Sequence, residues 1–137
     1  MASSQPDAPT VMIVDDADAV RIVLRMQLII LGYRVLEARD GVEALARARR
    51  ERPDLILMDV ALPVLDGLET ARFLQNAPET RDIPVVALTA FSDAGTRARA
   101  LEVGCREFAA KPIEMKDLGE VIARNLPPGG LSYPGRH

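Results

Sequence analysis

The stretch LILMD, residues 55–59, sets four apolar residues directly before an aspartate. Two other unbroken apolar runs lie at residues 11–14 and 85–88. Such runs are typical of strands that are buried on both faces of a parallel sheet. Residues 34–38 alternate more, which predicts an edge strand, and residues 107–110 predict a weaker fifth strand. The apolar runs therefore predict a five-stranded parallel sheet.

Amphipathic segments separate the predicted strands. Apolar residues at helical spacing predict a first helix that ends at Gly32, where a glycine suits a helix C-cap. Another helix would be capped by Ser92 or Asp93 and end at Gly104. Three more helices with this spacing are predicted around residues 44–48, 68–74 and 118–122. Strands that alternate with helices in this way predict right-handed crossovers and a doubly wound α/β sandwich.

The chain has 137 residues, which fits one compact domain. Residues 10–126 carry the periodic patterns and are predicted to form it. Residues 1–9 and 127–137 are rich in Pro, Gly and Ser and show no periodicity. We therefore expect a disordered N-terminus and a flexible C-terminal tail on either side of the domain.

Charge and composition argue against several classes of protein. A net charge of −3 gives no electrostatic reason to bind nucleic acid or an anionic membrane. Apolar stretches such as residues 28–31 are far below the roughly 20 residues that a membrane span needs. The single cysteine, Cys105, cannot form an internal disulfide, which favours a cytoplasmic location. The only histidine is His137, so histidine-based catalysis is not expected.

An arginine-rich segment lies on the second predicted helix, with Glu43 and Glu51 nearby. Its arginines are Arg47, Arg49, Arg50 and Arg52. Because no aromatic residues are interleaved with them, a solvated helix face is favoured over a nucleic-acid site.

Polar residues stand directly after four of the predicted strands, where ligands bind in an open parallel sheet. They are Asp15 and Asp16 after the first strand, Asp59 after the third, Thr89 after the fourth and Lys111 after the fifth. Carboxylates held close together are costly unless a cation neutralises them, and Mg²⁺ suits an all-oxygen site. A magnesium ion, a lysine and a hydroxyl around one carboxylate favour transfer of a phosphoryl group to that carboxylate.

Each of these residues also has a structural interpretation when it is taken singly. Asp16 or Asp18 would cap the helix that follows, Thr89 would be a turn residue, and Lys111 would be a solvated surface charge. The functional interpretation is favoured because every polar group follows its own buried run in a fold that binds ligands there.

Five ordered motifs resemble the receiver domains of two-component signalling, over roughly residues 10–125. They are VDD (14–16), GYRVLEARDGVEAL (32–45), LILMDVALPVLDG (55–67), VVALTAF (85–91) and AAKPI (109–113). The resemblance implies a flavodoxin-like sheet with strand order 2-1-3-4-5. It also implies a response regulator, which accepts a phosphoryl group from a histidine kinase or phosphotransfer protein.

The same resemblance implies roles around a magnesium ion. Asp59 would accept the phosphoryl group and also contact the metal. Asp16 would bind Mg²⁺ directly and Asp15 mainly through water, while the backbone carbonyl of Ala61 would supply another ligand.

Further residues are implied to respond to the phosphoryl group. The Thr89 hydroxyl and the Lys111 ammonium would each contact one of its oxygens, and small Ala90 would leave it room. Phe108 would be the switch aromatic that moves inward, and the bond between Lys111 and Pro112 would be cis.

Two positions that commonly tune phosphoryl lifetime in this family are Ala61 and Phe91 here. Neither side chain can orient an attacking water, so we expect slow self-dephosphorylation. The switch surface would be the fourth helix, fifth strand and fifth helix, roughly residues 93–125. It would bind a downstream protein target, or the chain would pass its phosphate along a relay.

Two other functions remain open. Asp16, Asp18 and Val20 are compatible with the nucleophile motif of a haloacid dehalogenase-like phosphatase, although only Asp117 and Glu120 could supply its later acidic pair. A receiver-fold binding module without phospho-switching is the second alternative.

Overall fold

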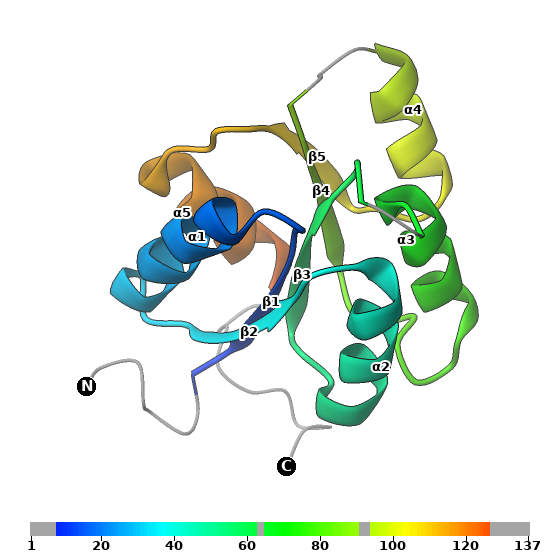
Figure 1. Ribbon diagram of the computed structural model, residues 1–137, viewed down its shortest axis with the longest axis horizontal. Helices are drawn as coiled ribbons and strands as arrows, with labels where there is room; N and C mark the ends of the chain where they lie inside the picture. The colour runs from blue at the N-terminus through cyan, green and yellow to red at the C-terminus, as the bar shows by residue number, and fades with distance from the viewer. Residues whose placement is uncertain (1–7, 63–64, 91–93, 127–137) are drawn as a thin grey trace.

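The computed structural model describes residues 8–62, 65–90 and 94–126, which form a parallel sheet with helices on both faces (Figure 1). The terminal segments expected to be disordered therefore lie mostly outside the described residues, as do Phe91 and the capping candidates Ser92 and Asp93. Pro9 is described and buried, and its carbonyl accepts the Arg34 N–H at 2.9 Å.

Strands and helices alternate through the described chain in the predicted order. They are β1 (Thr10–Val14), α1 (Asp18–Ile30), β2 (Arg34–Ala38), α2 (Gly41–Glu51), β3 (Leu55–Asp59), α3 (Gly67–Asn76), β4 (Val85–Thr89), α4 (Ala94–Glu102), β5 (Glu107–Ala110) and α5 (Met115–Asn125). All strand pairs are parallel, in the order β2-β1-β3-β4-β5. The predicted flavodoxin-like order and the edge position of residues 34–38 are confirmed.

Two apolar cores lie on opposite faces of the sheet. Ile13 and Leu57 pack with α1 and α5 on one face, and Met12 and Met58 pack with α2, α3 and α4 on the other (Figure 1). Because successive side chains of a strand point to opposite faces, a strand covered on both sides needs an unbroken apolar run. This arrangement accounts for the runs in β1, β3 and β4.

Glycines end α1 and α4, as predicted. Gly32 has φ +98° and Gly104 has φ +107°, a left-handed conformation that suits glycine. At the end of α1, the Tyr33 N–H bonds to the Leu28 carbonyl and the Gly32 N–H to the Ile29 carbonyl, both at 3.0 Å. This Schellman arrangement satisfies carbonyls that the helix end leaves unpaired.

The arginine-rich segment of α2 is a solvated helix face, as expected. Arg47 pairs with Glu51 at 2.9 Å and donates to the Glu37 carbonyl at 2.7 Å, while Arg49 and Arg52 are exposed. No helix in the described part of the chain is long and apolar enough to cross a membrane.

Candidate functional site at the carboxyl edge of the sheet

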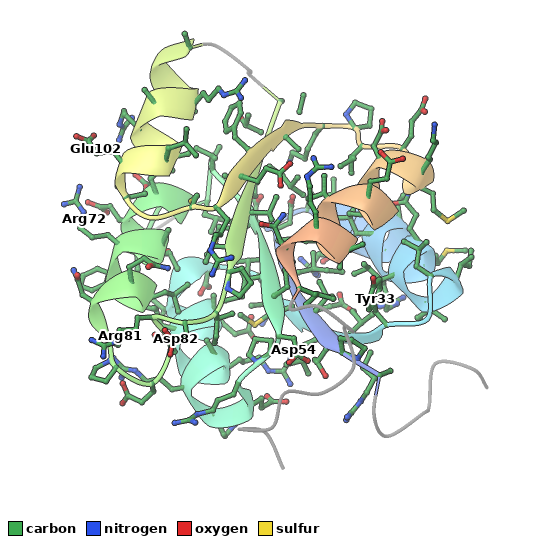
Figure 2. All side chains as sticks on the ribbon, turned by 180° about the vertical axis from the view of Figure 1, so that it is seen from behind. Tyr33, Asp54, Arg72, Arg81, Asp82 and Glu102 are labelled. Atoms are coloured by element: carbon green, nitrogen blue, oxygen red, sulfur yellow. The ribbon has the colours of Figure 1, made fainter. Side chains whose placement is uncertain are left out.

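Strand register brings the predicted site residues to one edge of the sheet. Val14 of β1 pairs with Met58 of β3, so Asp15 follows at the level of Asp59. Asp59 pairs with Leu88, the residue before Thr89. Thr89 itself pairs with Ala110, and Lys111 comes next. Asp54, in contrast, lies at the opposite end of β3 and accepts the Thr10 N–H at 2.7 Å (Figure 2).

Three carboxylates gather at this edge. Oxygens of Asp15, Asp16 and Asp59 all lie within 4.8 Å of one another. Asp15 is 2% exposed and Asp59 is 6% exposed, whereas Asp16 is open to solvent. A set of oxygen donors with one exposed member fits a hard cation that keeps part of its water shell, as Mg²⁺ does. The donor set therefore agrees with the expected metal.

Lys111 supplies a cation to the two buried carboxylates. Its Nζ lies 3.0 Å from Asp15 Oδ2 and 3.3 Å from Asp59 Oδ1. Burial by itself would lower the pKa of Lys111, but these carboxylates raise it above the ordinary value. Lys111 is therefore a charged part of the site, and the interpretation as a solvated surface charge is wrong.

Burial and neighbouring charges both act on the Asp59 carboxylate. Burial raises its pKa, and the charge of Asp15 raises it further, while Lys111 and the Ala61 N–H act in the opposite direction. The Ala61 N–H donates to Asp59 Oδ1 at 3.2 Å. The result is a carboxylate whose negative charge is only partly compensated.

The residues expected to respond to the phosphoryl group divide between the two faces of the sheet. Thr89 follows Val85 and Ala87 at alternate positions of β4, so it is on the face of the sheet that α2, α3 and α4 cover. Phe108 packs against the same core. Alternation along the strands places Asp15, Asp59 and Lys111 on the opposite face, which α1 and α5 cover. Thr89 is 3% exposed, and the Lys111–Pro112 bond is cis, as predicted.

Neither Asp16 nor Asp18 caps α1. The N-cap is Ala17, which has no side-chain cap hydrogen bond, and its N–H donates to Asp15 Oδ1 at 2.9 Å. The capping interpretation is wrong because the N-cap position falls on Ala17, whose methyl side chain has no oxygen to accept an N–H of the first turn. Both oxygens of Asp15 therefore have donors, since Oδ2 accepts from Lys111.

Two residues near the site were missed in the sequence. A Cβ on Gly67 would lie 2.1 Å from the Asp59 carbonyl oxygen, so α3 begins in contact with the end of β3 only because this residue is glycine. Arg21 is 9% exposed and contacts the loop between β1 and α1. It shares the helical spacing of buried Leu24 and Leu28, a signal that could have revealed its burial.

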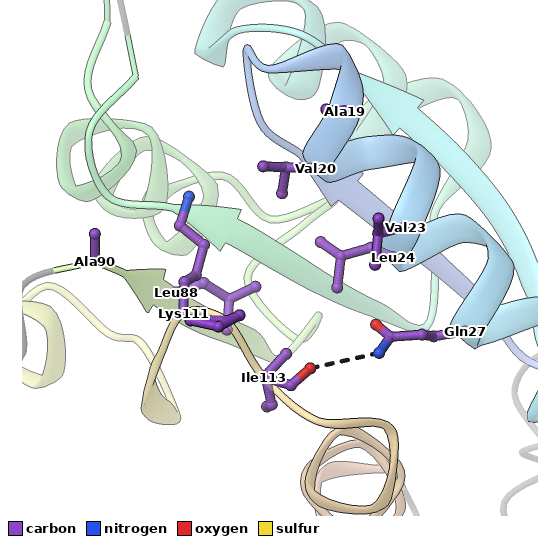
Figure 3. Close-up of a pocket in the computed structure, with 10 residues that line it drawn as sticks. Ala19, Val20, Val23, Leu24, Gln27, Leu88, Ala90, Lys111 and Ile113 are labelled. Carbon is purple, nitrogen blue, oxygen red and sulfur yellow. Dashed lines mark hydrogen bonds between the residues drawn. The ribbon is translucent and has the colours of Figure 1, made fainter.

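An apolar cavity of about 450 Å³ opens beside the site (Figure 3). Val20, Val23 and Gln27 of α1 line one side, and Lys111 and Ile113 line the other. Lys111 is thus shared between the cavity and the acidic cluster.

The fold and the site together define a doubly wound α/β protein with an acidic cluster and a lysine at the carboxyl edge of its sheet. The family model of the response regulator receiver domain matches residues 11–123. The polar-differentiation response regulator DivK of Brucella anthropi is 42% identical over 117 residues, which cover 85% of this chain and 95% of that protein. The chain belongs to the response-regulator receiver family.

Solved structures agree with this assignment. A putative response regulator from Chloroflexus aurantiacus matches with a TM-score of 0.83 and 33% identity, covering 86% of this chain and 97% of that one. The receiver domain of sensor histidine kinase PA1611 from Pseudomonas aeruginosa matches with a TM-score of 0.80 and 36% identity, covering 85% and 96%. That structure holds a magnesium ion coordinated in its active-site cleft.

Receivers interact with histidine kinases or phosphotransfer proteins and with downstream targets, and they carry a phosphoryl-accepting aspartate pocket. The phosphatase interpretation has no support from these matches. In addition, the Asp18 side chain is 82% exposed and pairs with Arg21, outside the acidic cluster.

Proposed function

We propose that this chain accepts a phosphoryl group on Asp59 from a histidine kinase or phosphotransfer partner, with Mg²⁺ held by Asp15, Asp16, Asp59 and the Ala61 carbonyl. One observation carries the proposal: a buried carboxylate lies 3.3 Å from a lysine and within 4.8 Å of two further acids. No general base is needed for the attack itself, because an ionised carboxylate has no proton to lose when it forms the bond.

Each residue has a distinct part in the transfer. An Asp59 oxygen forms a bond to phosphorus while the bond from phosphorus to the donor's imidazole nitrogen breaks, and the imidazole leaves with the electron pair. When bound, Mg²⁺ offsets the negative charge of the phosphoryl oxygens. Lys111 binds a phosphoryl oxygen, and it is already held beside Asp59 before the phosphoryl group arrives.

The hydrogen bonds of Asp15 and the exposure of Asp16 suggest different roles for the two residues in metal binding. Both oxygens of Asp15 already accept hydrogen bonds, from the Ala17 N–H and from Lys111. Asp16 is exposed and so is open to direct metal binding. This difference supports a direct contact for Asp16 and a water-mediated one for Asp15.

Phosphorylation would then be read at the β5 edge of the sheet. Ala87 pairs with Phe108, and Thr89 lies two residues further along the same face of β4. A Thr89 hydroxyl drawn toward the phosphoryl group leaves space that Phe108 fills, which biases the surface of α4, β5 and α5 toward its partner-binding form. The surface binds a protein target, and neither nucleic acid nor membrane is expected to bind there.

The phosphorylated form would be long-lived. Ala61 is exposed and carries no polar group to orient water, and the second such position, Phe91, lies outside the described residues.

The chain is a signalling protein that assists its own phosphorylation and dephosphorylation, not an enzyme acting on a separate substrate. Its cytoplasmic location stays a prediction.

Phosphorylation with a small donor tests the proposal. We expect wild-type protein incubated with acetyl phosphate and Mg²⁺ to gain one acid-stable, base-labile phosphoryl group by intact mass, and Asp59→Asn to gain none. Asp66→Asn is the matched control, because Asn can keep the N-cap hydrogen bond that Asp66 accepts from the Glu69 N–H. Equal labelling of wild type and Asp59→Asn would refute the assignment of Asp59.

A further inference from the structure

We propose that Arg21 is a positioning residue for the metal site, because its guanidinium orients the peptide between Asp15 and Asp16 and through it the Asp16 carboxylate. The inference rests on the proposed magnesium site. Arg21 lies in the first two turns of α1 and does not itself contact the metal.

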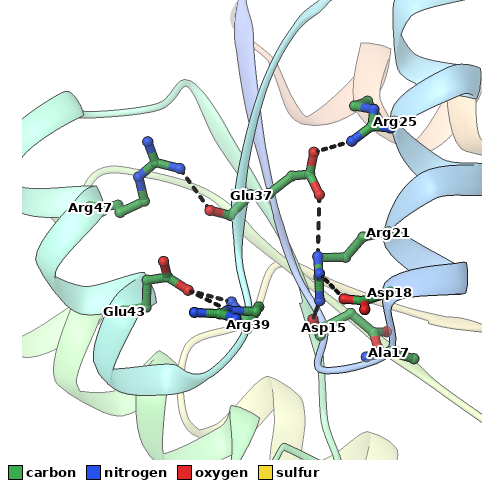
Figure 4. A network of polar contacts seen from close by, with 9 residues as sticks. All are labelled: Asp15, Ala17, Asp18, Arg21, Arg25, Glu37, Arg39, Glu43 and Arg47. Atoms are coloured by element: carbon green, nitrogen blue, oxygen red, sulfur yellow. Dashed lines mark hydrogen bonds and ion pairs between the residues drawn. The ribbon is translucent and has the colours of Figure 1, made fainter.

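Arg21 reaches three elements with one side chain (Figure 4). Its Nη1 donates to the Asp15 carbonyl at 2.7 Å, and this hydrogen bond is buried. Its Nε donates to Glu37 Oε1 at 3.2 Å, and its Nη2 pairs with Asp18. The guanidinium therefore joins the loop after β1, the start of α1 and the edge strand β2.

The Asp15 carbonyl belongs to the peptide that leads into Asp16. Within the described residues, no hydrogen bond to the Asp16 side chain is found, so its direction depends on the backbone on either side. On one side Arg21 holds the Asp15 carbonyl, and on the other Asp15 Oδ1 accepts the Ala17 N–H at 2.9 Å. Loss of the Arg21 contact would free the Asp15 carbonyl, so the peptide into Asp16 would be held only through its neighbours, by the bond from the Asp15 N–H to the Ala38 carbonyl at 3.1 Å and by the Ala17 N–H.

Glu37 anchors the guanidinium to the sheet. It pairs in register with Ile13 of β1, and its Oε2 also accepts from Arg25 at 2.8 Å. Its backbone carbonyl accepts from Arg47 of α2. Glu37 is thus held from both flanking helices (Figure 4), which gives Arg21 a rigid partner.

A lysine could not replace Arg21 in this geometry. The three acceptors lie in different directions around a planar group, and a guanidinium presents five donors in a fixed fork. A lysine ammonium keeps the charge but is a point donor on a flexible stem. Arg21→Lys therefore separates the orienting role from the charge.

The test compares Arg21→Lys with Arg25→Lys. Both replace an arginine of α1 that binds Glu37, but Arg25 makes no contact with the Asp15 carbonyl. We expect Mg²⁺ titration calorimetry on the full chain to give about tenfold weaker binding for Arg21→Lys and a change within about twofold for Arg25→Lys. In phosphorylation by acetyl phosphate, Arg21→Lys should need more Mg²⁺ for half-maximal rate and approach the wild-type rate at saturation.

Thermal unfolding by circular dichroism without Mg²⁺ shows whether each variant is folded. If Arg21→Lys is unfolded, Glu37→Gln decides, because it keeps Arg21 and weakens its anchor, and we expect weaker Mg²⁺ binding there too. Wild-type Mg²⁺ affinity in folded Arg21→Lys, or in Glu37→Gln when that variant decides, would overturn the inference alone. Absence of Mg²⁺ binding by the wild type would overturn the proposed metal site itself.

Discussion

Asp59 is only 6% exposed, and the carboxylate of Asp15 lies nearby. Burial and Asp15 both penalise the negative charge of Asp59, and Lys111 removes only part of the penalty. A folded protein that keeps such a group is less stable than its packing alone would allow. The cost is retained because the same uncompensated charge attracts a cation and a phosphoryl donor.

Asp59→Asn should therefore stabilise the protein at neutral pH. The folded pKa of Asp59 lies above its unfolded value, so ionised Asp59 destabilises the fold above the folded pKa, and this cost disappears as pH falls toward about 4. We expect urea unfolding in EDTA to show a gain in the free energy of unfolding at pH 7 and none near pH 3.5. A gain that stays constant with pH would contradict the electrostatic cause.

Ala61→Asn should shorten the life of the phosphorylated protein. An amide side chain two residues after Asp59 can orient a water for attack on the phosphoryl group, which alanine cannot do. We expect self-dephosphorylation, followed by loss of label after removal of acetyl phosphate, to become at least several-fold faster. An unchanged lifetime would show that the side chain at this position does not limit water attack.

At the scale of elements, the site depends on how closely α3 approaches the end of β3. The Gly67 N–H donates to the Val60 carbonyl at 2.9 Å, and Gly67 lies beside the backbone of Asp59. The atoms that a new Cβ would meet are backbone atoms, at 2.1 Å from the Asp59 oxygen and 2.9 Å from the Val60 Cα. The helix cannot shift away without loosening the strand end that carries the phospho-acceptor.

Gly67→Ala should consequently destabilise the fold by about 3 kcal/mol in urea unfolding and reduce phosphorylation of the folded fraction. Gly119→Ala in α5 is the control, because its Cβ would meet only the Leu31 side chain, at 3.3 Å. There we expect a change of less than about 1 kcal/mol, since alanine favours a helix. Similar effects at both glycines would contradict the role assigned to the close approach.

At the scale of the whole molecule, the site residues come from the loop after β1, the end of β3 and the segment after β5, and they meet only when these strands are paired. The unfolded chain does not bring the three acids together, so a cation that binds them stabilises the folded state alone. Metal binding should therefore be visible as stability of the whole domain.

We expect Mg²⁺ at about a hundred times its dissociation constant to raise the free energy of unfolding by about 2.7 kcal/mol. Urea unfolding in MgCl₂ and in EDTA at equal ionic strength measures this gain, which Asp16→Asn should lack. An equal gain in Asp16→Asn would assign the effect to general ionic screening.

The sequence alone determined the sheet, its helices and the residues at its carboxyl edge. It did so because a strand covered on both faces must be continuously apolar, so the first polar residue after each run marks a strand end. Gly32 and Gly104 were likewise predictable, because a left-handed helix end favours glycine.

Only the tertiary structure decided which of the polar residues act together. From the sequence, Arg21 would be taken as an ordinary helix charge; its role depends on Glu37 of β2 and on the Asp15 carbonyl in the loop after β1. From the sequence, Gly67 would be assigned to a loop, and its role is visible only in the fold, where the Asp59 backbone lies against it. In both cases the deciding contact joins residues from separate elements, and the pattern along one element does not contain the distance to the next.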